Sequence, residues 1–218
     1  MSTIDLLRHG EPDGGICYRG DGVDDPLSER GWEQMWAAVG EFTDWTHVVS
    51  SPLLRCRQFA ESVAERYQLP LAVDRRFREM SFGTWEGRRH EEVRDADPDA
   101  YYAFFRDAVN HRPPGMEPLD TFYERVRSGI MDVFDEHPEG HILLVCHLGV
   151  MWAAVSVQAG NWPQWRGPAF NGSSPETDLP THFSKTENVK WDAALPGPAS
   201  ATPIIWEDRV FVSSTDLQ

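Results

Sequence analysis

The amino-acid sequence predicts an α/β fold in which helices cover both faces of a mainly parallel sheet. Short apolar runs typical of buried strands alternate with longer segments of helical spacing, and this alternation is characteristic of parallel sheets flanked by helices. The chain has 218 residues, of which 40% are hydrophobic. That is enough for one domain with a substantial core.

The expected elements follow one another in a regular order. The first strand covers residues 3–7, and a helix over 28–42 begins behind Ser28, whose side chain suits an N-cap. A strand over 48–50 leads to a helix starting at Pro52, a residue suited to a first helical turn. The later elements are the helix over 52–67, a short strand over 71–73, helices over 97–109 and 119–134, a strand over 141–146 and a helical run after Gly149.

The helix expected over residues 97–109 carries four aromatic side chains. They are Tyr101, Tyr102, Phe104 and Phe105. Two readings are open: the cluster forms a lid lining a substrate pocket, or it is a packing face, and the second is favoured.

Polar residues stand where the predicted strands end. Arg8, His9 and Gly10 follow the first strand, and His147 follows the strand over 141–146. Arg55 lies near the start of the helix after the second strand, and Glu79 lies in a glycine-punctuated loop. Open α/β sheets bind ligands beyond the carboxyl ends of their strands. The sequence therefore predicts one site that collects these side chains.

The residue types in this set suit phosphoryl chemistry. An imidazole is a competent nucleophile near neutral pH because its usual pKa is about 6.5. Arg8 offers a planar fork of donors to phosphate oxygens, and Arg55 lies where a helix N-terminus favours anions. Gly10 is expected to allow a sharp turn and a close approach to the ligand.

Each of these residues has a structural alternative. Arg55 alone is compatible with a solvated helix position, and His147 alone with a satisfied residue at the end of a core strand. Glu79 competes for the role of acid with three neighbouring carboxylates, Glu86, Glu91 and Glu92.

On these four motifs, residues 1–154 resemble the histidine phosphatase superfamily and its phosphoglycerate mutase-like fold. The resemblance implies that His9 is phosphorylated, that Glu79 donates a proton, and that the phosphate is bound by Arg8, Arg55 and His147. No metal or cofactor is needed in that scheme.

The resemblance also suggests residues that surround the substrate. Gly115-Met116-Glu117 is similar to the family's Gly-Gly-Glu segment. Leu148 stands where the family usually has glycine or alanine, and is expected either to narrow the pocket or to crowd the backbone. The pocket candidates are therefore Glu11, Tyr18, Glu117 and Leu148.

The likeness is closer to α-ribazole-phosphatase-like bacterial members. These share the Arg-His-Gly-Glu-Pro opening of residues 8–12, a Tyr-Arg-Gly stretch at 18–20 and a Pro-Leu-Ser-Glu stretch at 26–29. Mutases of the family carry serine and a Trp-Asn pair soon after the triplet, whereas this chain has Glu-Pro-Asp-Gly-Gly at 11–15. Hydrolysis of a small phosphorylated metabolite is therefore expected rather than mutase activity.

Composition limits the partners and the compartment. The formal net charge is −15, from 20 basic and 35 acidic residues, and the pI is about 4.8. This balance argues against a nucleic acid or an anionic membrane as a partner. Three cysteines without motif spacing and a start that leads straight into a strand favour a cytoplasmic protein. The oligomeric state is left open.

The chain changes character from about residue 160. Four of the nine tryptophans lie beyond this point: Trp162, Trp165, Trp191 and Trp206. Residues 162–168 and 187–191 resemble the N-terminal part of quinoprotein β-propellers of the pyrroloquinoline-quinone type. Residues 200–212 then predict the first hairpin of a blade. One blade buries too little to form a propeller or a quinone site, so no cofactor is expected.

The sequence thus indicates a composite chain. Residues 1–158 form a histidine phosphatase domain that lacks its usual C-terminal strand, and residues 159–218 form a poorly autonomous, irregular or β-rich fragment. The alternatives to an active phosphatase are a catalytically inactive composite fragment and an interaction module with a tryptophan-rich tail.

Overall fold

The computed structural model describes residues 2–155, 204–206 and 209–211. The chain divides into two compact units, Met1–Val157 and Gln158–Gln218. Each unit is described by itself.

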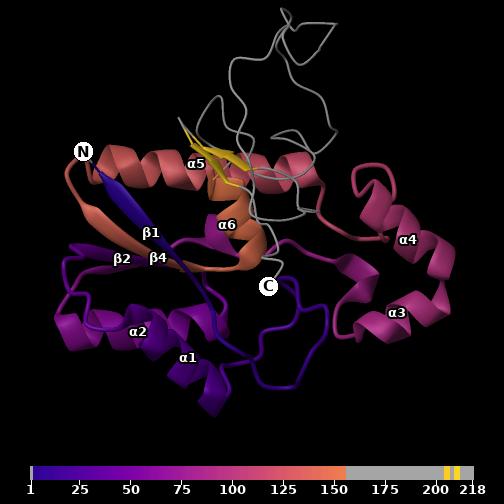
Figure 1. The fold of residues 1–218 in the computed structure, drawn as a ribbon, viewed down its shortest axis with the longest axis horizontal. Coiled ribbons are helices and arrows are strands. Elements are labelled where there is room, and N and C mark those ends of the chain that lie inside the picture. Colours follow the sequence, from indigo (N-terminus) through magenta and orange to yellow (C-terminus); the bar gives the residue numbers. More distant parts are fainter. Residues whose placement is uncertain (1, 156–203, 207–208, 212–218) are drawn as a thin grey trace, which may run out of the picture. The chain divides into compact units, whose positions relative to one another are not determined.

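The first unit is built on a four-stranded sheet in the order β1-β4-β2-β3 (Figure 1). The strands are β1 (Thr3–Arg8), β4 (His141–Cys146), β2 (His47–Ser50) and β3 (Leu71–Val73), and all the pairs are parallel. Arg8 pairs with Cys146, and Ser50 pairs with Val145. The carboxyl ends of β1, β4 and β2 therefore lie together at one edge of the sheet.

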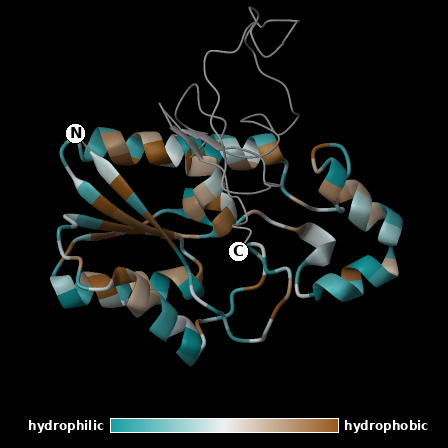
Figure 2. Cartoon of the chain, in the orientation of Figure 1, coloured by the Kyte–Doolittle hydropathy of each residue, from teal (hydrophilic) through white to brown (hydrophobic). Residues whose placement is uncertain are grey.

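Helices cover both faces of this sheet. On one face lie α1 (Glu29–Val39) and α2 (Leu54–Tyr67), and on the other lie α5 (Leu119–Glu136) and α6 (Leu148–Val155) (Figure 1). Strand β4 serves both layers, because Leu143 and Val145 pack with α1 and α2, whereas Ile142 and Leu144 pack with α5 and α6. Figure 2 shows the central strands as the hydrophobic middle of the unit. The predicted fold class is confirmed.

A third hydrophobic cluster lies under two short helices, α3 (His90–Ala96) and α4 (Pro98–Arg106). It also involves the 3₁₀ turn η2 (Gly83–Trp85). In α4, Tyr101 and Phe104 pack into the cluster, whereas Tyr102 and Phe105 are about half exposed. The packing interpretation thus holds for two of the four aromatic residues.

Helix α3 was absent from the predicted elements. Its sequence, His-Glu-Glu-Val-Arg-Asp-Ala, buries only Val93 and so shows no helical stripe. The helix begins instead with a local interaction, in which Glu92 accepts a hydrogen bond from the backbone N–H of Arg89 (3.0 Å). The polar capping interaction therefore marks the N-terminus of α3, which the apolar pattern does not indicate.

Several helix boundaries differ from the prediction. Helix α1 ends at Val39 rather than at residue 42, and α5 ends at Glu136 rather than at residue 134. Helix α2 begins at Leu54 rather than Pro52, because Asp24 from a distant loop accepts a hydrogen bond from the Leu54 N–H at 2.6 Å. Helix α4 ends at Arg106 rather than at residue 109. The predicted Ser28 cap of α1 is confirmed, since its hydroxyl accepts from the Gly31 N–H at 3.0 Å.

In the second unit, β5 (Ile204–Trp206) and β6 (Arg209–Phe211) form an antiparallel pair. This confirms a hairpin within residues 200–212. The predicted loss of the C-terminal strand and the quinoprotein resemblance fall mostly outside the described residues, and both stay predictions. No helix in the described parts of the chain has the length and apolar character needed to cross a membrane.

Candidate active site

The carboxyl edge of the sheet brings two histidines together. His9 follows β1, and its backbone N–H donates to the carbonyl oxygen of Cys146 at 3.1 Å. His147 follows β4 directly. The centroids of the two imidazole rings lie 5.2 Å apart, and the ring planes are inclined at 61° to each other. Residues 138 positions apart in the sequence thus meet because parallel neighbours end at the same edge.

A hydrogen bond at Nδ1 orients the ring of His9 and leaves Nε2 available. Its Nδ1 lies 2.7 Å from the carbonyl oxygen of Gly10. A carbonyl only accepts, so Nδ1 carries the proton in this contact and Nε2 keeps its lone pair. Burial lowers the pKa of His9 to about 4, partly opposed by the Gly10 hydrogen bond and reinforced by the charge of Arg55. His9 is therefore a neutral imidazole at pH 7.

Gly10 is needed for a different reason from the predicted sharp turn. Its φ is not in the positive region. A Cβ at this position would lie 2.2 Å from the carbonyl oxygen of Gly31 at the start of α1. The backbone after His9 therefore packs directly on a helix end, which leaves no room for a side chain.

His147 is completely buried and is also uncharged. Its Nε2 lies 2.7 Å from the hydroxyl of Ser51, which follows β2, and 3.5 Å from the Cys56 sulfur. Burial, followed by the positive charge of Arg55, lowers its pKa well below the usual 6.5. Ser51 was not among the predicted site residues. The sequence feature that could have predicted Ser51 as a site residue is its position at the end of a strand, four residues before Arg55.

Arg55 is a buried cation without an ion pair among the described residues. Arg55 lies in the first turn of α2, and only 1% of its surface is exposed. Its Nη1 and Nη2 donate to the carbonyl oxygens of Val23 (2.9 Å) and Gly20 (2.8 Å), while its buried Nε has no hydrogen-bond partner within the part of the chain that the structure describes. An unpaired buried charge is costly. This arrangement therefore suits an anionic ligand.

Arg8 ends β1 and is exposed. Its charge contributes to lowering the pKa of both His9 and His147, which places it beside the same site. Arg8 and Arg55 thus act on both neutral imidazoles, and Arg19 and Arg125 each act on one of them.

Glu79 lies in the loop after the 3₁₀ turn η1 (Arg75–Phe77). Its Oε1 accepts from the N–H of Met80 at 3.0 Å, and its Oε2 from the N–H of Gly149 at 3.3 Å, in the first turn of α6. Burial raises the pKa of Glu79, although these hydrogen bonds and Arg55 oppose the rise. A Cβ on Gly149 would lie 2.4 Å from Oε1, so the carboxyl reaches the helix only because residue 149 is glycine.

The three competing carboxylates have other contacts. Glu86 accepts from the hydroxyl of Ser81 and the N–H of Phe82. Glu91 and Glu92 pair with Arg89 at the exposed start of α3. Of these four acids, Glu79 is the one beside the segment that follows His147.

The four pocket candidates are placed in different surroundings. Glu11 is exposed and pairs with Arg30 at 3.6 Å, and Leu148 is half-buried at the start of α6. Tyr18 is buried in the third cluster, against Trp85. The carboxylate of Glu117 binds the guanidinium of Arg125.

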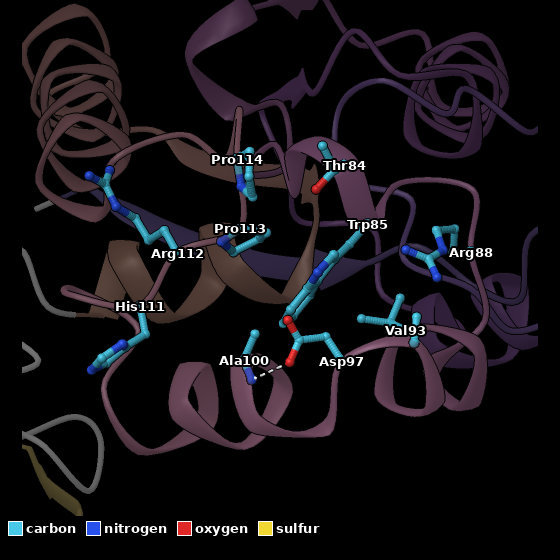
Figure 3. Close-up of a pocket in the computed structure, with 11 residues that line it drawn as sticks. Thr84, Trp85, Arg88, Val93, Asp97, Ala100, His111, Arg112, Pro113 and Pro114 are labelled. Atoms are coloured by element: carbon cyan, nitrogen blue, oxygen red, sulfur yellow. Dashed lines mark hydrogen bonds between the residues drawn. The ribbon is translucent and has the colours of Figure 1, made fainter.

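A separate cavity of about 230 Å³ lies between η2, α3, α4 and residues 111–114 (Figure 3). Trp85 and Asp97 face each other in it, and Asp97 already accepts from the Ala100 N–H at 2.9 Å to cap α4. None of the predicted site residues lines this cavity. Within the described ranges, no group of three or more His, Cys, Asp or Glu side chains is arranged to hold a metal ion.

Comparison with known proteins identifies relatives of the same fold. The sequence profile of the histidine phosphatase superfamily (branch 1) matches residues 4–177. The uncharacterized phosphatase PhoE of Bacillus subtilis is 30% identical over 168 residues, which cover 75% of this chain and 81% of PhoE. Glucosyl-3-phosphoglycerate phosphatase of Mycobacterium tuberculosis is 30% identical over 205 residues, covering 85% of this chain and 90% of the relative.

A solved structure supports the same relationship. The putative α-ribazole-5'-P phosphatase of Escherichia coli superposes with a TM-score of 0.64 at 29% identity, over 73% of this chain and 81% of that chain. The profile match spans more than half of the chain and includes the strand-end histidines, Arg55 and Glu79. The chain therefore belongs to the histidine phosphatase superfamily.

Proposed function

We propose that this protein hydrolyses phosphomonoesters through a phosphohistidine intermediate on His9. The observation that carries the proposal is the pairing of a neutral His9, whose Nε2 keeps its lone pair, with the buried and unpaired cation of Arg55. A nucleophile and a site for the phosphoryl charge are thus present together. The phosphatase names of the relatives support the same reaction class.

In the first step, the Nε2 lone pair attacks phosphorus and forms an N–P bond while the ester P–O bond breaks. Glu79, whose pKa burial raises, gives its proton to the leaving oxygen. The proton on Nδ1 stays against the Gly10 carbonyl. Splitting one displacement into two easier ones is the advantage of a covalent intermediate.

In the second step, water attacks phosphorus and gives a proton to the Glu79 carboxylate. The N–P bond breaks, inorganic phosphate leaves, and Nε2 recovers its lone pair. Glu79 returns to its protonated form, so the cycle closes. Phosphoryl transfer depends mainly on positioning and electrostatics. Arg8, Arg55 and His147 supply donors for the equatorial oxygens.

The proposed substrate is a small phosphorylated metabolite, and the proposed setting is the cytoplasm. The relatives named above include phosphatases for glucosyl-3-phosphoglycerate and, putatively, α-ribazole 5'-phosphate. The catalytic unit is proposed to be residues 1–158, with residues 159–218 as a separate segment.

The full-length chain should hydrolyse p-nitrophenyl phosphate at the same rate with and without EDTA. The expected chemistry uses only side chains to neutralise the phosphoryl charge. Rapid quenching followed by peptide mass spectrometry should find the phosphoryl group on His9. A soluble, cooperatively melting protein without turnover, or a label on another residue, would contradict the proposal.

Glu79→Gln should lower kcat/KM for an alkyl phosphate, which reports the phosphorylation of His9, by about 10²- to 10⁴-fold, the usual contribution of a general acid. The kcat/KM for p-nitrophenyl phosphate should be affected much less, because nitrophenolate leaves without a proton. Burial raises the pKa of Glu79, so the acid stays protonated at higher pH than usual and kcat/KM falls only above that pKa. Glu79→Gln should abolish this basic limb. The acid limb should lie near pH 4, where His9 becomes protonated.

Glu92→Gln is the matched control, because it removes an acid of the same type from exposed α3. It should leave the activity on both esters and the pH profile unchanged. Equal losses of kcat/KM on the two esters in Glu79→Gln would rule out the acid role.

A further inference from the structure

Arg125 connects helix α5 to the loop that carries Glu79. Its Nη1 donates to the carbonyl oxygens of Arg76 (2.5 Å) and Arg78 (2.9 Å), and its Nη2 donates to that of Glu79 (3.1 Å). Three carbonyls within four consecutive residues are thus held by one guanidinium.

The other two donors of Arg125 bind Glu117. Nε and Nη2 each lie 2.7 Å from one of the two carboxylate oxygens. A guanidinium has five N–H donors, so all of them are used. Only 12% of the Arg125 side chain and 9% of the Glu117 side chain is exposed. The guanidinium also lies over the ring of Phe122, 4.7 Å from its centroid. The orientation of the fork is therefore fixed on every side.

These contacts end at Glu79, whose carboxyl group lies at the start of α6, two residues after His147. The backbone carbonyl of Glu79 is held by Arg125, while its carboxylate is held 3.3 Å from the Gly149 N–H. Backbone and side chain are anchored on two different helices, α5 and α6. A shift of the loop would move the carboxyl relative to His9, and a misplacement of about 1 Å can cost about 10²-fold in rate.

We propose that Arg125, oriented by Glu117, is a positioning residue for Glu79. It fixes the loop so that the carboxyl group of Glu79 can reach the leaving oxygen of the ester whose phosphorus His9 attacks. This inference rests on the proposed function, in which Glu79 is the acid. It also gives Glu117 a part in the site, through Arg125 rather than through contact with substrate.

The charge of Arg125 acts on Glu79 in the same arrangement. Burial raises the pKa of the Glu79 carboxyl, and the N–H groups of Met80 and Gly149 and the cations of Arg55 and Arg125 oppose that rise. Arg125 thus limits how strongly the acid holds its proton, in addition to fixing where it stands.

Arg125→Gln in the 218-residue chain should lower kcat/KM for an alkyl phosphate by about 10- to 100-fold. The kcat/KM for p-nitrophenyl phosphate should change by less than about threefold, since that ester has little need of the acid. Arg125→Lys should recover part of the loss, because it keeps the charge but not the fork of donors. A residue with a purely structural role would lower both activities together, through the fraction of folded protein.

Two further variants complete the test. Glu117→Gln keeps the shape of the side chain and should show the same selective loss in milder form, even if Arg125→Gln folds poorly. Arg127→Gln, on the same helix but exposed, should leave both activities unchanged. Equal losses on the two esters in Arg125→Gln and Glu117→Gln would overturn the inference if Glu79→Gln is selective for the alkyl ester. Equal losses in Glu79→Gln itself would overturn the acid role, and this inference with it.

Discussion

Replacing His9 with alanine should lower turnover of p-nitrophenyl phosphate by on the order of 10⁴-fold or more, because no other nucleophile takes its place. His9 is half-buried at the end of β1, and its ring makes one hydrogen bond, to the carbonyl of Gly10. Its pKa is lowered mainly by burial, so at pH 7 the variant loses a neutral ring and no ion pair. The free energy of unfolding should change by about 1 kcal/mol or less. Steady-state kinetics and a thermal melt measure the two effects separately.

His141→Ala is the matched control for this experiment. His141 begins β4 at the amino end of the strand, where its Nε2 lies 2.9 Å from Asp5. The substitution removes the same side chain from the same sheet, at the end opposite the site. Activity should remain, with at most a modest loss of stability. Turnover retained in His9→Ala would contradict the phosphohistidine route.

Arg55→Met should lower turnover by about 10³-fold or more, the scale on which arginines stabilise phosphoryl transfer. The same substitution should change the free energy of unfolding of the ligand-free protein by no more than about 2 kcal/mol. The wild type buries a guanidinium that has no ion pair among the described residues, so removing it relieves a desolvation cost. The carbonyl oxygens of Val23 and Gly20 lose their hydrogen bonds in return, and the two effects oppose each other.

Binding of inorganic phosphate should show the same contrast. A ligand that binds only the folded state raises its stability by mass action. Phosphate should therefore raise the melting temperature of the wild type and have much less effect on Arg55→Met. Arg57→Met, on the same helix and paired with Glu61 near the surface, is the control that should keep both properties. A strongly destabilised Arg55→Met protein whose activity falls only with its folded fraction would indicate a structural role.

Much of this architecture could be predicted from the sequence. The strands over 3–7, 48–50, 71–73 and 141–146 appear within one or two residues of the expected limits, because buried parallel strands are continuous apolar runs between turn residues. The position of His9 and His147 directly after two such strands was equally visible. Their meeting follows from the rule that parallel strands end at one edge.

Other features could not be predicted because they depend on contacts between distant residues. Helix α3 has no apolar stripe, and α2 begins at Leu54 because Asp24 from another loop accepts its N–H. The family resemblance selected Glu79 over Glu86, but the contact that distinguishes the two carboxylates, with the Gly149 N–H at the start of α6, lies 70 residues away and is not visible in the local sequence.

The sequence by itself determined the order of the elements, the family motifs and the edge of the sheet at which they gather. The tertiary structure decided that Arg55 is buried without an ion pair, that His9 and His147 are neutral, and that Glu117 binds Arg125. Local patterns record which residues suit a strand or a helix. Burial and charge state depend on what the rest of the chain packs around each group, and no local pattern contains that information.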